Sequence, residues 1–269
     1  MDIIDIGWLL VLGAVVGLLA GLLGIGGGMI MVPFMAILLE RLGFSPDTVI
    51  KVAIATSLAT IVFTSASSVR AQHAKGAVRW DLVRALAPGI MLGSLIGAQF
   101  AAWMRSGLLT LIFGLFIATM ATQMLRQKKP NPDRTLPGPA GLFGAGGLIG
   151  TASAVLGAGG GFLTVPFLVK RNVKIHNATG TSAACGFPIA LAGTAGYIIA
   201  GWNVEMPDWT AGYLFVPALI AISLASVLTA PLGVKLAHRM SVQRLKRFFA
   251  FMLYCLAAYM LWRAWRFGL

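Results

Sequence analysis

Two matching glycine-rich runs, each followed by Val-Pro-Phe, constrain the fold of this chain more than any other feature. The first run is LGIGGG at residues 23–28, with Val-Pro-Phe at 32–34, and the second is LGAGGG at 156–161, with Val-Pro-Phe at 165–167. Four glycines within five positions do not form a stable helix interior, because each costs about 1 kcal/mol relative to alanine. The runs therefore predict a helix break at matched places in two related halves.

The segments around these breaks are apolar enough to lie in a membrane. Hydrophobic residues make up 58% of the chain and charged residues 11%, which leaves too little polar surface for a soluble domain. Several stretches reach the roughly 20 residues that cross a bilayer. We therefore expect an all-α integral membrane protein whose apolar segments are 6–24, 29–40, 47–70, 80–103, 106–125, 140–157, 162–169, 176–200, 209–237 and 242–262.

A polar stretch divides the chain into its two halves. Residues 127–139 (QKKPNPDRTLPGP) are rich in proline and charge, which a helix inside the hydrocarbon layer would not carry. The order of the apolar segments is the same before and after this stretch. We predict a first transmembrane repeat at 1–126, a cytoplasmic linker at 127–139 and a second transmembrane repeat at 140–269.

The distribution of basic residues indicates how the two repeats are oriented. The net charge of +13 could suggest a nucleic-acid partner, but lysine and arginine also collect in the cytoplasmic loops of membrane proteins. If each glycine break turns the chain back, 16 of the 21 basic residues lie on one side of the membrane. If the chain continues across, the 21 basic residues divide about 10 to 11 between the two sides. The bias favours inverted repeats, both termini on the periplasmic side of a bacterial plasma membrane, and a lipid bilayer rather than nucleic acid as the partner.

Inverted repeats with broken helices predict a site near the middle of the membrane. Such repeats are a common way to build alternating access, in which the substrate is held between discontinuous helices. A helix that restarts after a glycine break points free N–H groups and a positive dipole end at whatever lies beyond it. We therefore predict that an anionic substrate is bound by Gly26, Gly27, Gly28, Pro33, Thr56, Ser57, Gly159, Gly160, Gly161, Pro166, Thr181 and Ser182.

Each of these residues also has a purely structural interpretation. The glycines could only permit close helix crossing, and the small hydroxyl residues could only join helices. Pro33 and Pro166 fall in the first turns of the restarted helices, where a missing N–H costs little, so a structural duty suits them better than substrate contact.

The acidic residues favour an anion over a cation as the substrate. All eight lie in loops, at the termini or at segment ends, whereas cation and proton carriers generally need ionisable groups deep in the membrane. We predict no metal site, no cofactor and no enzymatic activity, since the sequence shows no metal-ligand spacing, nucleotide loop or catalytic triad order. A homo-oligomer is compatible with this composition.

The paired motifs LGIGGGMIMVPF and LGAGGGFLTVPF, each followed by an Ala-Thr-Ser or Gly-Thr-Ser step, resemble the TauE/SafE family of sulfite exporters. The resemblance covers essentially the whole chain. It implies a plasma-membrane transporter that exports sulfite or small organosulfur anions such as sulfoacetate. The second half departs from the pattern at Cys185, Gly186 and Pro188, which argues against two exactly equivalent sites.

Two other functions fit the same sequence. A membrane scaffold subunit that does not transport would pack its glycine runs tightly against other helices. An anion channel would share the composition and the breaks. A structure separates the scaffold from the transporter by what lies between the two runs.

Overall fold

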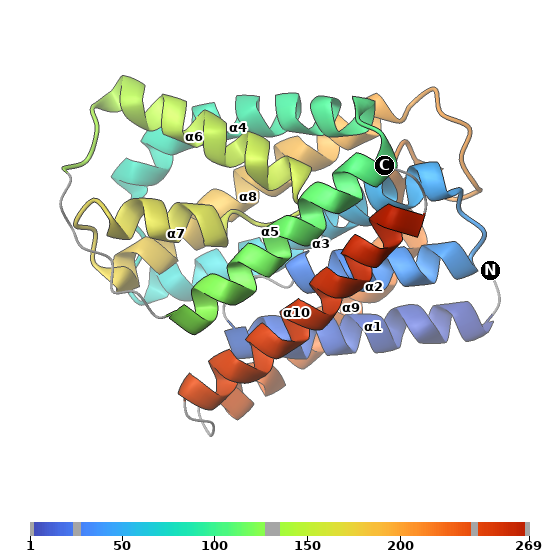
Figure 1. Cartoon of the computed structure of the whole chain (residues 1–269). Coiled ribbons are helices and arrows are strands. Elements are labelled where there is room, and N and C mark those ends of the chain that lie inside the picture. The colour runs from blue at the N-terminus through green and yellow to red at the C-terminus, as the bar shows by residue number, and fades with distance from the viewer. Residues whose placement is uncertain (1–2, 24–27, 127–134, 238–241, 267–269) are drawn as a thin grey trace.

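The computed structural model is a bundle of helices with one short hairpin, and it describes residues 3–23, 28–126, 135–237 and 242–266 (Figure 1). The first half contributes α1 (Ile3–Leu23), α2 (Gly28–Arg41), α3 (Pro46–Ala74), α4 (Trp80–Trp103) and α5 (Ser106–Arg126). The second half contributes α6 (Pro139–Val155), α7 (Gly161–Val169), α8 (Ile175–Ala200), β1 (Thr210–Ala211), β2 (Leu214–Phe215), α9 (Val216–Ala237) and α10 (Val242–Arg266).

Five of these helices are long and apolar enough to cross a membrane, namely α3, α4, α5, α8 and α10. Shorter apolar stretches lie in α1, α6 and α9. The architecture agrees with the expected all-helical membrane protein. Most of the linker at 127–139 lies outside the described residues, so the cytoplasmic linker stays a prediction.

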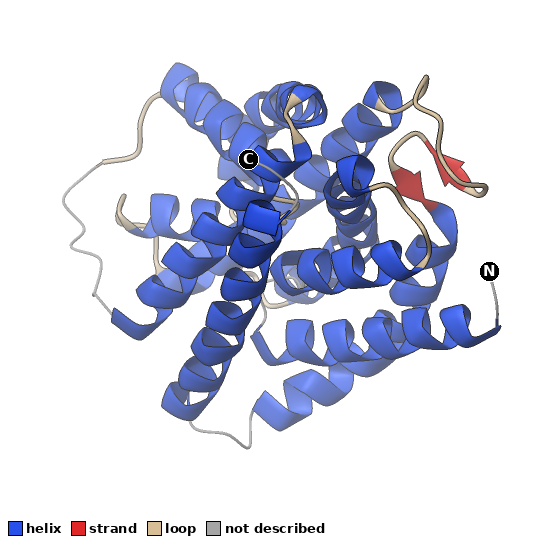
Figure 2. Cartoon of the chain, turned by 45° about the vertical axis from the view of Figure 1, so that its right-hand side comes forward, coloured by secondary structure: helices blue, strands red, loops and turns tan. Residues whose placement is uncertain are grey.

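One expected segment begins later than the sequence suggested. The apolar run 209–237 is not continuous helix, because β1 and β2 form a two-stranded antiparallel hairpin before α9 starts at Val216 (Figure 2). Trp209 and Gly212 both adopt positive φ, which a helix does not contain. Gly212 also packs against the carbonyl of Ile198 so closely that an added Cβ would lie 2.3 Å from that oxygen. The turn therefore requires glycine, and the apolar residues around it cover the end of α8.

At one end of the bundle, the start of α1 meets the ends of α2 and α10. The guanidinium of Arg41 lies 5.9 Å from the centre of the Trp8 ring, so α2 runs back alongside α1. The neighbouring Glu40 forms an ion pair with Arg263, with 2.6 Å between carboxylate oxygen and guanidinium Nε. The loop before α3 and the hairpin lie at the same end, because Phe44 stacks edge-on against Phe215 at 5.2 Å.

At the opposite end, the start of α6 meets the ends of α7 and α3. Leu136, just before α6, shares a pocket with Arg171 and Lys174 from the loop after α7, so α7 also runs back alongside α6. The side-chain amide of Asn177 donates to the carbonyl of Ala77 in the loop after α3. The ends of α2 and α7 therefore lie near the starts of α1 and α6, respectively.

The most extensive helix contacts join a helix of one half to a helix of the other half. α1 packs on α9 and α6 packs on α4, which pairs the first helix of each half with the fourth helix of the other. The third helices, α3 and α8, pack on each other, as do the fifth helices, α5 and α10. Exchanging the two halves leaves this set of neighbours unchanged, so the repeated sequence has a matching repeat in the packing.

Glycines permit the two closest of these crossings. Gly89, Gly93 and Gly97 form a stripe on α4, and a Cβ added at Gly93 would lie 2.1 Å from the carbonyl oxygen of Gly147 in α6. In α1, a Cβ added at Gly17 would lie 2.3 Å from the Thr229 hydroxyl of α9. Such small-residue contacts bring helix backbones together, which is the main source of helix association within a bilayer.

Candidate functional site

The two glycine breaks touch each other in the middle of the bundle. Gly28 is the first residue of α2 and is buried, and a Cβ added there would lie only 2.6 Å from the carbonyl oxygen of Gly157. Gly157 in turn packs against Val32 and Ile54. The predicted residues Gly26 and Gly27 lie outside the described residues. For Gly28 the structure favours the packing interpretation, since the space a side chain would need is filled by backbone.

Ser57 joins the two breaks from α3. Its buried hydroxyl lies 3.2 Å from the carbonyl oxygen of Gly157 and 3.4 Å from that of Gly28. A serine hydroxyl has one proton, so it donates to one of these oxygens at a time. Ser57, which we predicted to bind the substrate, directs its proton at backbone carbonyls of the two breaks.

The second break has two glycines in the left-handed region. Gly157 has φ of +58° and Gly160 has φ of +73°, a conformation that glycine adopts without the steric cost of a Cβ. Between them, the N–H of Ala158 donates to the backbone carbonyl of Ser153, and the N–H of Gly160 donates to the backbone carbonyl of Ala158. This tight turn ends α6 and starts α7 at Gly161.

The start of α7 gathers polar groups that have no hydrogen-bond partner among the described residues. The amides of Leu163 and Thr164 donate to Gly160, so the earlier amides of Gly161 and Phe162 have no place in the helical ladder. The hydroxyls of Ser153 and Thr164 are fully buried, and within the described part of the chain neither has a hydrogen-bond partner.

Both hydroxyls lie near Gly160, as does the side chain of Ile189. A Cβ built on Gly160 would be 3.4 Å from the Thr164 hydroxyl and 3.6 Å from the Ser153 hydroxyl. A buried hydroxyl without a partner costs free energy, about 1–3 kcal/mol, so two of them near one helix start call for an explanation. Two such groups next to free helix-start amides can donate to an anion.

The other predicted hydroxyl residues divide into two kinds. Thr56 and Thr181 hold loops, because Thr56 accepts the N–H of Phe215 at 3.2 Å and Thr181 accepts the N–H of Arg79 at 3.0 Å. Phe215 directly precedes α9, and Arg79 directly precedes α4. The two threonines therefore accept equivalent hydrogen bonds, each from the residue before the fourth helix of one half. Ser182 is buried, and no protein partner for its hydroxyl is found among the described residues.

The prolines lie deeper in their helices than expected. Pro33 is the sixth residue of α2 and Pro166 the sixth of α7, so both fall in the second turn rather than the first. A proline there cannot donate to the carbonyl four residues earlier, which belongs to Met29 in α2 and to Phe162 in α7. The expectation of a cost-free first-turn position was wrong, because each helix has already begun at the last glycine of its run.

Sequence reasoning missed Ser153 and Thr164. Aligning the two glycine runs places Ala20 and Met31 at the corresponding positions of the first half. The signal was therefore a departure from the repeat, with polar residues replacing apolar ones on both sides of one break only. A comparison that looks only for what the halves share discards such positions.

Comparison with known proteins decides the family. The model of the family described as "Sulfite exporter TauE/SafE" matches residues 9–260, nearly the whole chain. This chain belongs to the TauE/SafE family. No solved structure matches it.

Several relatives carry the name "Probable membrane transporter protein". One from Haemophilus influenzae is 37% identical over 250 residues, covering 92% of this chain and 95% of the relative. A relative from Methanocaldococcus jannaschii is 26% identical, with 88% of each chain covered. Another from Bacillus subtilis, YunE, is 28% identical over 72% of this chain and 78% of its own length. TauE/SafE membership and these names indicate a membrane transporter rather than an enzyme.

Proposed function

We propose that this protein is a secondary transporter that exports a small sulfur-containing anion, sulfite or an organosulfonate, across the bacterial plasma membrane by alternating access. The family description names sulfite export, and the relatives are named as membrane transporters. The observation that carries the proposal is the start of α7, where free amides meet the buried hydroxyls of Ser153 and Thr164.

These groups suit an oxyanion. Sulfite and sulfonates present several oxygens that accept hydrogen bonds, while the break offers amide and hydroxyl donors and the positive end of a helix dipole. Hydrogen bonds to a charged acceptor are about twice as strong as those between neutral groups. Binding would thus satisfy groups that the protein alone leaves unsatisfied.

The acidic side chains support an anion as well. The described acids within helices, which are Asp5, Glu40, Asp47 and Asp81, lie in the first or last turn, and Glu205 and Asp208 lie in a loop. Each of these six is exposed or half-buried. None of these six carboxylates is buried, which supports a buried site without negative charge that would repel an anion.

The contacts at the two ends of the bundle support inverted repeats. α1 begins at the end where Arg41 meets Trp8, whereas α6 begins at the opposite end, beside Arg171. The end near α6 carries Arg79, Lys174 and Lys75, as expected for the cytoplasmic side. Both termini then lie in the periplasm. A pseudo-two-fold axis in the membrane plane that relates the two halves would also account for the matched helix pairs between them.

Flux from proteoliposomes tests the proposal. Vesicles loaded with sulfite and containing the purified chain should release it with saturable kinetics, and external unlabelled sulfite should accelerate exchange of labelled sulfite from inside. A channel would show flux without this acceleration, and a scaffold would show no flux above empty vesicles. Absence of saturable transport for sulfite, sulfoacetate and related sulfonates would refute the proposed substrate class.

A further inference from the structure

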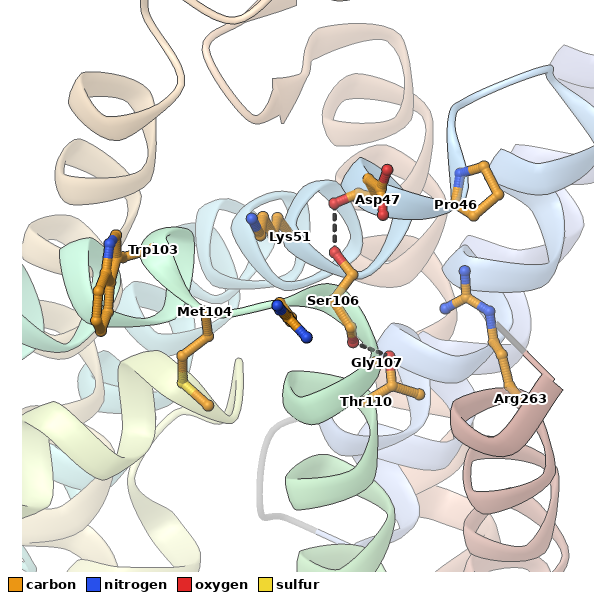
Figure 3. A pocket seen from close by; sticks show the side chains of 10 residues that line it. Pro46, Asp47, Lys51, Trp103, Met104, Ser106, Gly107, Thr110 and Arg263 are labelled. Atoms are coloured by element: carbon orange, nitrogen blue, oxygen red, sulfur yellow. Dashed lines mark hydrogen bonds between the residues drawn. The ribbon is translucent and has the colours of Figure 1, made fainter. Parts of the chain in front are cut away.

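A second polar pocket lies away from the glycine breaks, at the end of the bundle where α3 and α5 begin. Its volume is about 460 Å³, and its walls come from α3, the α4–α5 junction, α5 and α10. Figure 3 shows Asp47 and Lys51 of α3, Ser106 of α5 and Arg263 of α10 around this space. We call it the α3–α5 pocket.

Positive charge dominates the α3–α5 pocket. Lys51, Arg105 and Arg263 line it, against a single carboxylate, that of Asp47. Glu40, which pairs with Arg263, offsets part of this charge, and the mutual repulsion of Lys51 and Arg105 favours a bound anion that screens them. This charge does not follow from the proposed topology, which assigns this end the fewer basic residues of the two.

Two of the three cations are fixed in place. The ammonium of Lys51 donates to the carbonyl oxygen of Ala102 at 2.7 Å and lies 5.8 Å from the centre of the Tyr213 ring. An ammonium has three protons, so this single bond leaves it further donor capacity. Arg263 is 3% exposed and held by Glu40, which orients its guanidinium at the pocket wall. Groups held in this way bind a ligand without the entropic cost of ordering them.

The start of α5 adds donors on the same wall. Ser106 and Gly107 line the pocket, and the first backbone bond of α5 runs from Leu109 to Arg105. The amides before Leu109 therefore precede the helical ladder. The Ser106 hydroxyl donates to the carbonyl of Asp47, which ties the start of α5 to the start of α3. The positive end of this helix thus lies against the same cationic space.

We propose that the α3–α5 pocket binds an oxyanion with one or two negative charges, held mainly by Lys51, Arg105 and Arg263. The oxyanion can be a free anion or the phosphate of an anionic lipid, which share this chemistry; Trp103 beside the pocket is 84% exposed on the helix surface. The placement of the pocket on the periplasmic side rests on the proposed function, and there it would receive the exported anion. The binding itself does not depend on transport.

Titration of the purified full-length chain tests this site. Calorimetry with sulfite in detergent should show weaker binding in Lys51→Gln, by about tenfold, or roughly 1.4 kcal/mol. Asp47→Asn removes the opposing charge and should strengthen binding by about threefold. Arg70→Gln, an exposed arginine outside the pocket, is the matched control and should bind as the wild type does.

Two further arms separate the outcomes. Ser153→Ala disables the proposed transport site, so the effect of Lys51→Gln should persist in that background even if transport proves absent. Nanodiscs with phosphatidylglycerol, compared with phosphatidylcholine alone, should weaken sulfite binding if the lipid phosphate occupies the pocket, and should leave it unchanged if the free anion does. Equal affinity in the wild type, Lys51→Gln and Asp47→Asn, with no retention of phosphatidylglycerol by any of them, would overturn the proposal.

Discussion

Ser57 of α3 donates its hydroxyl proton across the molecule to the carbonyl oxygen of Gly157, 3.2 Å away, which joins the third helix of one half to the glycine break of the other. The same hydroxyl lies 3.4 Å from the carbonyl of Gly28. The breaks are therefore not independent loops, because the hydroxyl of Ser57 lies within hydrogen-bond distance of a backbone carbonyl in each. If the proposed transport cycle moves one break relative to the other, the acceptor of the Ser57 hydroxyl changes.

Replacing Gly28 should damage the contact between the breaks. In Gly28→Ala, the new Cβ would lie 2.6 Å from the carbonyl oxygen of Gly157 and 2.8 Å from Ile61, and the backbone oxygen cannot move aside as a flexible side chain would. We expect a loss of about 1–3 kcal/mol in the free energy of unfolding, typical of overpacking. Thermal unfolding of the purified variant in detergent measures it.

Gly144→Ala is the matched control for this substitution. Gly144 is exposed in α6, and a Cβ there would meet nothing within 4 Å. Alanine should leave stability unchanged or raise it by about 0.5–1 kcal/mol, through its better helix propensity. Equal stability changes in the two variants would contradict the close approach of the breaks.

Ser153→Ala and Thr164→Val should separate function from stability. Both hydroxyls are buried, and neither has a partner among the described residues, so removing them should change the free energy of unfolding by less than about 1 kcal/mol or even raise it. Transport of sulfite should fall by about tenfold or more, because donors to the anion are lost. Flux from proteoliposomes and thermal unfolding of the same preparations give the two readings.

The exposed Ser67 of α3 offers a control for these variants. Ser67→Ala removes a hydroxyl of the same kind far from α7 in the sequence and should alter neither flux nor stability. If Ser153→Ala transports as well as Ser67→Ala does, then Ser153 does not contact the substrate.

Sequence could predict the break but not everything around it. The helical class followed from local rules, because glycine propensity and hydrophobic length act over a few residues, whereas Ser57 was assigned to the site region from the family resemblance. Ser153 and Thr164 could not be found by those rules, since their proximity depends on the φ of Gly160, which brings the end of α6 over the start of α7. The hairpin before α9 was missed for a similar reason, because apolar residues such as Tyr213 and Phe215 look alike in a helix and in a buried turn.

Thr56 and Thr181 should prove equally important, because they hold equivalent loops. Thr56→Val leaves the buried amide of Phe215 without its acceptor, and Thr181→Val removes the acceptor of the Arg79 amide, whose hydrogen bond is partly buried. Each variant should lose about 1–3 kcal/mol in the free energy of unfolding. Serine at either position keeps the hydroxyl, so Thr56→Ser and Thr181→Ser should recover most of the loss. Failure of serine to recover it would show that the methyl group, not the hydrogen bond, matters.

The orientation of the halves predicts which loops a membrane-impermeant thiol reagent can reach in intact cells. The background for this test is Cys255→Ser, since Cys255 is exposed and Cys185 is buried. With outer-membrane-permeabilised cells, Arg41→Cys at the end of α2 should be labelled from the periplasm, whereas Lys75→Cys after α3 should be labelled only when the inner membrane is broken.

Both positions are exposed in the structure, so a difference in labelling reports sidedness rather than burial. A parallel arrangement of the two halves predicts a different side of the membrane for Arg41→Cys. If α2 continued across the membrane instead of turning back beside α1, Arg41→Cys would lie on the cytoplasmic side with the N-terminal end of α1 outside. A returning α2 requires that Trp8→Cys and Arg41→Cys are both labelled from the periplasm, because the Arg41 guanidinium lies 5.9 Å from the Trp8 ring. Lys75→Cys should stay unlabelled under the same conditions.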